Sequence, residues 1–284
     1  MDEFTAVLRA RDLVSKVNPA AIPVDVESYA AHVSAIIRPQ NDLGQDEPGW
    51  SFKSGGKHFI CINENDSAER QRFTICHELA HIILGLPSEH TALPWWSYSS
   101  RPLNEILCDI FAAELLLPYQ LFKTIADDEE ICFATVEHLA ERFTASNTAT
   151  GSRFAAVITA PCAFVLSEKG IVRYASRSLA MREVNAWIPP RMVLPPGSLS
   201  ERVCKGKICN GPEEIDADLW LSDWTRGGIL LEEARHLSRW DQTLTLLWFE
   251  DEEVPQSYEE IEDDLMGLKE LDGILPWPGK KRRK

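Results

Sequence analysis

The spacing of apolar residues divides the chain into a helical first part and a second part of mixed character. In the first part, apolar positions recur three or four residues apart, which predicts helices with one buried face. The predicted helices cover residues 4–16, 26–37, 67–84, 103–117, 119–126, 134–143 and 147–158. Gly85 and Pro118 follow the two longest of them, as expected where a helix must end.

Strands are predicted where apolar and polar residues alternate on both sides of a turn. Residues 49–63, GWSFKSGGKHFICIN, predict a hairpin with the Ser-Gly-Gly sequence as its turn. Residues 162–176, CAFVLSEKGIVRYAS, predict a second hairpin around a Lys-Gly turn, and the apolar run 242–249 predicts a buried strand. Residues 40–50 are expected to form a loop.

Together these elements predict the α+β class. We expect residues 1–159 to form a mainly helical domain with a small β-sheet, and residues 160–250 to form a β-containing C-terminal domain. Residues 251–284 are strongly acidic up to Asp272 and end in the basic run Lys280–Lys284. Such a composition predicts a partly disordered tail.

The composition and net charge of the chain indicate which kinds of partner it can bind. The chain has 284 residues, of which 44% are hydrophobic and 26% charged, as in soluble globular proteins, and its formal net charge is −15. Duplex DNA and anionic membranes attract clustered positive charge, so this balance disfavours both and favours a protein partner with a basic face. The chain has neither an apolar run of about 20 residues nor a signal-peptide core, so we expect it to be cytoplasmic.

The seven cysteines are odd in number, scattered and mostly placed in apolar segments. This pattern is typical of free thiols in a reducing compartment. Cys204 and Cys209 form a C-x4-C pair. No second pair of Cys or His residues lies near it in the sequence, so a loop is favoured there and a metal site is the lesser alternative.

The strongest chemical signal is His77-Glu78-Leu79-Ala80-His81, an H-E-x-x-H sequence within the predicted helix 67–84. Residues four apart share a helical face, so both imidazoles can reach one zinc ion at the usual distance of about 2.0–2.1 Å. Glu78 then lies beside the metal, where a carboxylate can act as general base on a bound water. The apolar flanks predict a buried helix, in which these polar groups need a partner. The sequence therefore predicts a zinc-dependent hydrolase.

A catalytic zinc usually has three protein ligands and one open position. We predict that Glu105, on the helix 103–117, is the third ligand. Asp109 lies four residues further on the same face and can accept the remaining N–H of a ligand histidine, although a helix-pairing carboxylate is the alternative. Glu114 is the rival third ligand, but it lies about two and a half turns from Glu105 and is disfavoured.

A peptidase also needs a donor for the oxyanion that develops on the attacked carbonyl. Four polar side chains flank the two predicted site helices and are candidates, without a basis for choosing among them: His90, Tyr98, Arg101 and Tyr119.

Residues 134–158 have the outline of a helix-turn-helix whose second helix carries Arg153. DNA contact is one interpretation, and two helices that pack beneath the hydrolase site are the other. The acidic residues of the first helix and the net negative charge favour packing.

The same residues carry a family resemblance. RQRFTICHELAHIILG (70–85) followed by EILCDIFAAELLLP (105–118) resembles the ImmA/IrrE family of zinc metallopeptidases, with a thermolysin-like site. Weaker similarity extends the resemblance to about residues 20–155. It implies the same roles as the spacing does, with metal ligands at His77, His81 and Glu105 and the catalytic glutamate at Glu78. The sequence departs from the family pattern at several positions without removing a ligand, and these include Cys76, Ala80, Cys108 and Asp109, the last in place of the usual Asn.

The resemblance implies an endopeptidase that cleaves a helix-turn-helix repressor or a similar regulatory protein and so derepresses stress, phage or mobile-element genes. Residues 160–250 would then be a sensor or docking module. Two alternatives stay open: a metal-binding regulator that sequesters its partner without cutting it, and a DNA-binding regulator. The presence of Glu78 favours cleavage over sequestration, because sequestration needs no base. The metal used in the cell is zinc in this interpretation, with manganese or another divalent ion as the alternative.

Overall fold

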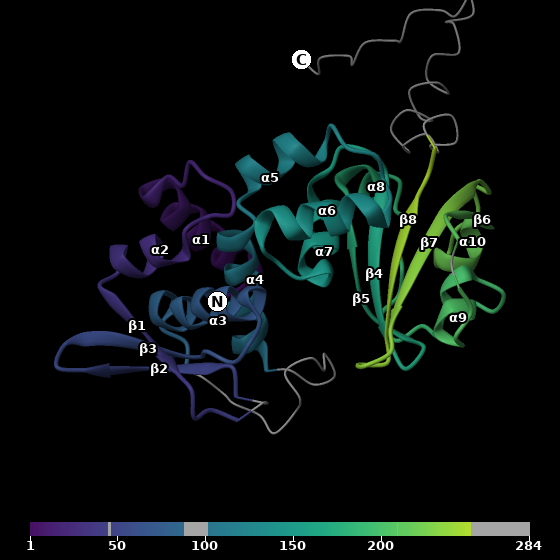
Figure 1. Cartoon of the computed structure of the whole chain (residues 1–284). Helices are drawn as coiled ribbons and strands as arrows, with labels where there is room; N and C mark the ends of the chain where they lie inside the picture. The colour runs from purple at the N-terminus through teal and green to yellow at the C-terminus, as the bar shows by residue number, and fades with distance from the viewer. Residues whose placement is uncertain (45–46, 88–101, 209, 251–284) are drawn as a thin grey trace, which may run out of the picture.

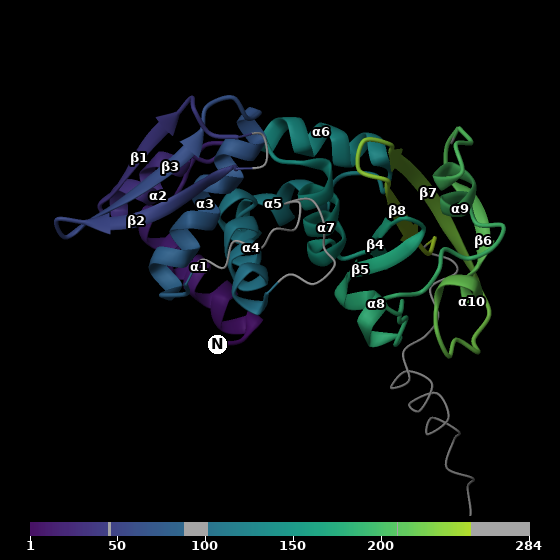
Figure 2. The ribbon, with the colours of Figure 1, turned by 90° about the horizontal axis from the view of Figure 1, so that it is seen from below.

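The computed structural model describes residues 1–44, 47–87, 102–208 and 210–250. Its helices and strands form an α+β protein with two separate sheets, and Figures 1 and 2 show the helices α3–α7 between them. The predicted tail, 251–284, lies outside the described residues. Among the residues that are described, no helix combines the length and the apolar character that a bilayer crossing needs.

The first part of the chain is mainly helical, as the sequence predicts. Its helices are α1 (Glu3–Val17), α2 (Val26–His32), α3 (Ala68–Leu84), α4 (Leu103–Leu116), α5 (Tyr119–Ala126), α6 (Phe133–Phe143) and α7 (Asn147–Val157). Its strands are β1 (Ala35–Gln40), β2 (Gly49–Ser54) and β3 (Lys57–Asn63). They form a small sheet in the order β1-β3-β2, in which β1 runs parallel and β2 antiparallel to β3.

The predicted hairpin at 49–63 is present as β2 and β3, but the predicted helix 26–37 is wrong in its second half. Helix α2 ends at His32, and Ser34 has a left-handed backbone with φ of 57° that a helix does not contain. Ile36 and Ile37 then enter β1, where they pair with β3. Branched side chains suit a pleated strand, and the parallel partner needed to form it lies more than twenty residues away in the sequence.

The second part of the chain contains a five-stranded antiparallel sheet in the order β5-β4-β8-β7-β6. Its strands are β4 (Cys162–Glu168), β5 (Ile171–Arg177), β6 (Glu213–Asp216), β7 (Ile229–Leu237) and β8 (Gln242–Trp248). Three short helices accompany it: α8 (Leu179–Glu183), α9 (Leu199–Cys204) and α10 (Ala217–Trp220). The hairpin β4–β5 and the strand β8 match the predicted segments, whereas β6 and β7 were not predicted.

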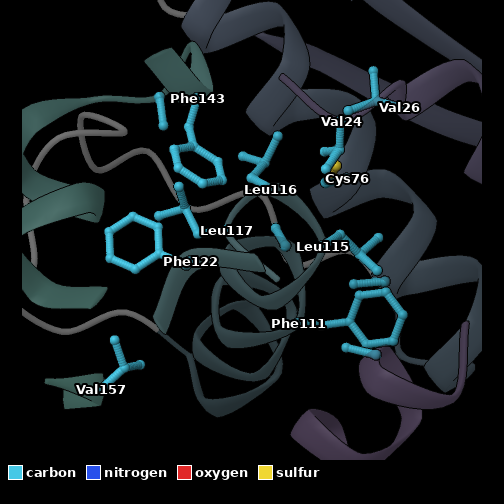
Figure 3. Packing of buried hydrophobic residues seen from close by; sticks show 14 of the residues in the cluster. Val24, Val26, Cys76, Phe111, Leu115, Leu116, Leu117, Phe122, Phe143 and Val157 are labelled. Atoms are coloured by element: carbon cyan, nitrogen blue, oxygen red, sulfur yellow. The ribbon is translucent and has the colours of Figure 1, made fainter. Parts of the chain in front are cut away.

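One continuous apolar core joins the helices to the near face of this second sheet. Figure 3 shows its centre, where Leu117 at the end of α4 lies near Phe122 and Phe143 of the following helices, and Phe111 and Leu115 of α4 lie on the other side of the view. The same cluster continues into the sheet through Phe164, Leu166, Leu244 and Leu246. A separate cluster around Trp220 covers the opposite face. The division into domains at residue 160 stays a prediction, and the core runs across that position.

Gly151 is the point of closest approach between α7 and β4. A Cβ atom added there would lie 2.3 Å from the ring of Phe164, which is fully buried. Alanine favours a helix by about 1 kcal/mol over glycine, but forcing an extra methyl group into a packed core costs about 1–3 kcal/mol. We therefore expect Gly151→Ala to destabilise the protein by up to about 2 kcal/mol in urea unfolding followed by circular dichroism. A raised midpoint would mean that Phe164 moves aside at no cost and that only the gain in helix propensity is left.

Candidate metal centre

Two long helices bring the predicted site residues together. Helix α3 carries His77, Glu78 and His81, and it packs beside α4, which carries Glu105 and Asp109. The four residues nearest the centre are 9%, 1%, 5% and 6% exposed, in the order His77, Glu78, His81 and Glu105. Glu105 lies in the first turn of α4, where the helix dipole favours a negative charge.

Three ligand atoms from these helices converge on one point. Nε2 of His77 lies 3.1 Å from Nε2 of His81 and 3.1 Å from Oε2 of Glu105. Nε2 of His81 lies 3.6 Å from Oε1 of Glu105. Ligands with bonds of about 2.0–2.1 Å around a tetrahedral ion are about 3.3–3.4 Å apart. The separations in the site bracket that value.

The other ring nitrogens are held by hydrogen bonds that fix the histidine tautomers. Nδ1 of His77 lies 3.0 Å from Oδ1 of Asp109, and Nδ1 of His81 lies 3.1 Å from the carbonyl oxygen of Leu86. Both partners are acceptors, so each neutral imidazole places its proton on Nδ1 and its lone pair on Nε2. The two lone pairs and the Glu105 carboxylate then face one another, and a cation between them removes the repulsion.

The Leu86 contact was not predicted, although its cause is visible in the sequence. Gly85 ends α3 in the left-handed conformation, with φ of 67°. A glycine at this position reverses the chain direction, and the next carbonyl can then point back at the last turn of the helix. Here that turn carries His81.

The electrostatics of His77 also show that the centre attracts positive charge. Burial alone lowers the pKa of its imidazole, but the hydrogen bonds to Asp109 and Glu105, together with nearby carboxylate charge, outweigh burial and raise the pKa to about 10. A proton and a divalent ion compete for the same lone pair of Nε2. The residues therefore fit a divalent metal ion, with His77, His81 and Glu105 as the groups that would hold it.

Glu78 lies against this centre without belonging to the converging set. One of its carboxylate oxygens is within 4.8 Å of ligand nitrogens of His77 and His81. Its Oε2 atom is buried and has no hydrogen-bond partner among the described residues. A buried carboxylate oxygen without a partner is costly, so this atom is suited to bind a further polar molecule, such as a water, at the centre.

Asp109 is expected to set metal affinity through His77. Removing the group that orients a metal-binding histidine typically lowers affinity about 10–100-fold. We expect this loss for Asp109→Ala, measured by competition with a chelator of known affinity. Asp109→Asn is the matched control, because an amide oxygen can still accept from Nδ1. Equal affinity of wild type and Asp109→Ala would show that His77 is oriented by packing alone.

Glu114 and Tyr119 lie away from the centre, toward the other end of α4. Glu114 is nine residues beyond Glu105, about 14 Å along a helix. It forms ion pairs with Arg11 of α1 and Arg153 of α7, and it accepts a hydrogen bond from the backbone N–H of Tyr119. The ring of Tyr119 lies beneath both guanidinium groups. The structure thus brings neither residue to the histidines. His90, Tyr98 and Arg101 lie outside the described residues.

The contacts of Arg153 indicate whether the helix pair α6–α7 packs inside the protein or faces outward as a DNA-binding motif would. Its Nε donates to the carbonyl oxygen of Leu117, and its guanidinium pairs with Glu114, so the side chain points into the protein. Thr150 and Gly151 on the same helix are buried. These contacts match the packing interpretation of the predicted helix-turn-helix.

Comparison with known proteins agrees with this geometry. Residues 37–154, which include both site helices, match the family model of the IrrE N-terminal-like domain, Peptidase_M78. This part of the chain is thus similar to the IrrE N-terminal-like domain. Over 119 residues it is 28% identical to the radiation response metalloprotease IrrE of Deinococcus deserti, a match that covers 41% of each chain. The chain thus spans about two fifths of the length of this curated relative. The matched family model is named a peptidase and the relative a metalloprotease, and a divalent metal at the centre described above agrees with both names.

A solved structure extends the likeness of the fold beyond residues 37–154. A Mycobacterium tuberculosis transcriptional regulator superposes with a TM-score of 0.55 at 13% sequence identity. The superposition covers 86% of this chain and 76% of the regulator. At this identity the comparison concerns the fold alone, and its coverage shows that the likeness continues past residue 154.

Proposed function

We propose that this protein is a zinc-dependent endopeptidase that cleaves a regulatory protein partner. The observation that carries the proposal is the convergence of two imidazole lone pairs and one carboxylate beside the unpartnered oxygen of Glu78. Two nitrogens and one oxygen are the donor set of many catalytic zinc sites, and three protein ligands leave one position open. Manganese or another divalent ion is the alternative occupant, because affinity alone does not decide metal choice in the cell.

Each residue has a defined part in the proposed reaction. When bound, a divalent ion polarises the carbonyl to be attacked and increases the acidity of a water. Glu78 accepts a proton from that water and donates it to the leaving amine, which its buried and unpartnered oxygen allows. Asp109 holds His77 in the tautomer that presents Nε2 to the centre.

The proposed substrate is a DNA-binding repressor of the helix-turn-helix type in the cytoplasm. The formal charge of −15 supports this class, because a repressor carries a basic face toward DNA and an acidic enzyme attracts it. The name of the IrrE relative associates that protein with a radiation response, and the structural neighbour is named a transcriptional regulator. Both names suit a role in derepressing stress genes. Residues 160–250 would dock the partner or sense the signal.

Metal analysis tests the centre directly. Zinc bound per chain is measured by elemental analysis for wild type, Glu105→Ala and Glu129→Ala. The Glu105 variant is expected to lose one equivalent, because a ligand is removed. The control removes an exposed glutamate between α5 and α6 and should lose none. Equal zinc content in all three proteins would exclude Glu105 as a ligand, and no zinc in wild type after supplementation would exclude the peptidase.

The substrate can be identified in cells that express either the wild-type chain or Glu78→Gln. Labelling of new protein N-termini, followed by mass spectrometry, should reveal fragments of a DNA-binding protein only with the wild type. If the partner is inactivated by both proteins without being cut, sequestration replaces cleavage as the function.

A further inference from the structure

A second group of metal-ligating side chains lies in the C-terminal sheet. Cys204 is the last residue of α9, His236 is near the end of β7, and Asp241 lies in the turn between β7 and β8. One ligand atom from each residue lies within 4.8 Å of the other two. Cys204 and His236 are half-buried and Asp241 is exposed, so the group is open to solvent on one side.

Helix α9 is fixed on the sheet at its beginning, which determines where Cys204 lies. The buried carboxylate of Glu232 accepts hydrogen bonds from the backbone N–H groups of Leu199 and Ser200, at 3.0 and 2.8 Å. It also accepts from the hydroxyl of Ser200 at 2.5 Å. These contacts satisfy the first turn of the helix and place a negative charge at its positive end. Figures 1 and 2 both show α9 lying beside β7.

The other two side chains are held by the β7–β8 hairpin. His236 and Thr243 are cross-strand partners, and Nδ1 of the imidazole lies 3.0 Å from Oγ1 of the buried Thr243. This contact orients the ring and leaves Nε2 for another partner. Asp241 has φ of 51°, and its carbonyl oxygen accepts a hydrogen bond from the N–H of Lys169 at 2.8 Å. The β7–β8 turn, which carries the Asp241 carboxylate, is therefore hydrogen-bonded to the turn of the β4–β5 hairpin.

We propose that Cys204, His236 and Asp241 form a second metal site, for zinc or a similar borderline ion. Sulfur, imidazole nitrogen and carboxylate oxygen are the three ligand types that zinc accepts. Magnesium and calcium are disfavoured because they require oxygen ligands throughout. On binding, the thiol loses its proton to the solvent and coordinates as thiolate. Three protein ligands with one exposed side leave a position for water or for a group of another molecule.

A cysteine, a histidine and an aspartate can also form a nucleophilic triad, but the contacts here do not fit one. In a triad the imidazole bridges the nucleophile and the carboxylate through its two nitrogens. Nδ1 of His236 lies 3.0 Å from Oγ1 of Thr243, so this nitrogen is engaged by a hydroxyl rather than left to bridge a thiol and a carboxylate. A thiol, an imidazole nitrogen and a carboxylate oxygen that all lie within 4.8 Å of one another are instead a donor set for a metal.

Cobalt(II) is the probe that separates this site from the one on α3 and α4. Only a cobalt ion bound to thiolate gives sulfur-to-metal charge-transfer absorption, and the converging atoms of His77, His81 and Glu105 include no sulfur. We expect wild type to bind two equivalents, one of them with this absorption. Cys204→Ser should bind one equivalent without it, and His77→Ala one equivalent with it. Cys132→Ser, which removes another half-buried thiol, should behave as wild type.

Two further variants allow the proposal to be tested even if one of the variants does not fold. His236→Gln should lower the affinity for the cobalt ion that gives this absorption by at least about tenfold. Loss of a residue that only orients a ligand already lowers metal affinity by about 10–100-fold. Thr243→Val, which keeps the side-chain shape, should lower the affinity of the same site for cobalt by about 10–100-fold. Absence of the charge-transfer absorption in wild type, or its survival in Cys204→Ser, overturns the proposal. Neither result bears on the peptidase, which is tested by Glu105→Ala.

Discussion

Replacing Glu78 by glutamine is expected to lower the rate of peptide hydrolysis by about 10²–10⁴-fold and to leave metal content unchanged. The amide has nearly the same shape as the carboxylate but cannot accept a proton from water. Glu78 is 1% exposed and its Oε2 has no hydrogen-bond partner among the described residues, so in the wild type this oxygen is available to accept that proton.

The measurement is single-turnover cleavage of the partner found by N-terminal labelling, with zinc content determined on the same samples. Glu105→Ala should lose activity together with one metal equivalent, whereas Glu78→Gln should lose activity alone. This difference separates a general base from a ligand. Full activity in Glu78→Gln would assign proton transfer to another group.

Glu114→Ala is expected to give the largest loss of stability, about 3–5 kcal/mol. Glu114 is 2% exposed and holds Arg153 of α7 at 2.8 Å and Arg11 of α1 at 3.2 Å. Without it, the contacts left to the largely buried guanidinium of Arg153 among the described residues are the hydrogen bond to Leu117 and the ring of Tyr119, and neither carries a compensating charge. Removing one partner of a buried pair leaves the other charge uncompensated, and that penalty exceeds the value of the pair itself.

Urea unfolding followed by circular dichroism measures this loss, and Arg11→Ala is the matched control. The Arg11 side chain is 46% exposed, and an ion pair with such a residue contributes about 0–1 kcal/mol. Losses of similar size in the two variants would show that the charges at this end of α4 are screened by water.

The site was predictable because its information is largely local. His77, Glu78 and His81 lie within five residues, and a helix alone places them on one side. Glu105 needed one further assumption, that the next long apolar helix packs beside the first. The geometry agrees with that assumption, while the residue roles stay predictions until they are tested. The Leu86 contact needed the backbone course after Gly85, which sequence spacing does not give.

Strand β7 was missed because its sequence contradicts the usual pattern of a buried strand. It contains Glu232 and Glu233 side by side, and both are buried. Alternation directs them to opposite faces, where Glu232 caps α9 and Glu233 accepts from the N–H of Phe133 at the start of α6. Their cost is offset by helices distant in sequence, and for Glu233 also by an ion pair with Arg235 of β7 itself. Cys204, His236 and Asp241 were not connected for the same reason, since their proximity depends on β7.

The core that crosses residue 160 has a consequence for how such proteins can diverge. The family match ends at residue 154, yet Phe164 of the sheet beyond it fills the space left by Gly151 of α7. Replacing this sheet by another domain would therefore also require substitutions on the face of α7 that packs against it. We expect the two positions to vary together among related sequences: a relative with a larger residue in place of Gly151 should have a smaller one in place of Phe164.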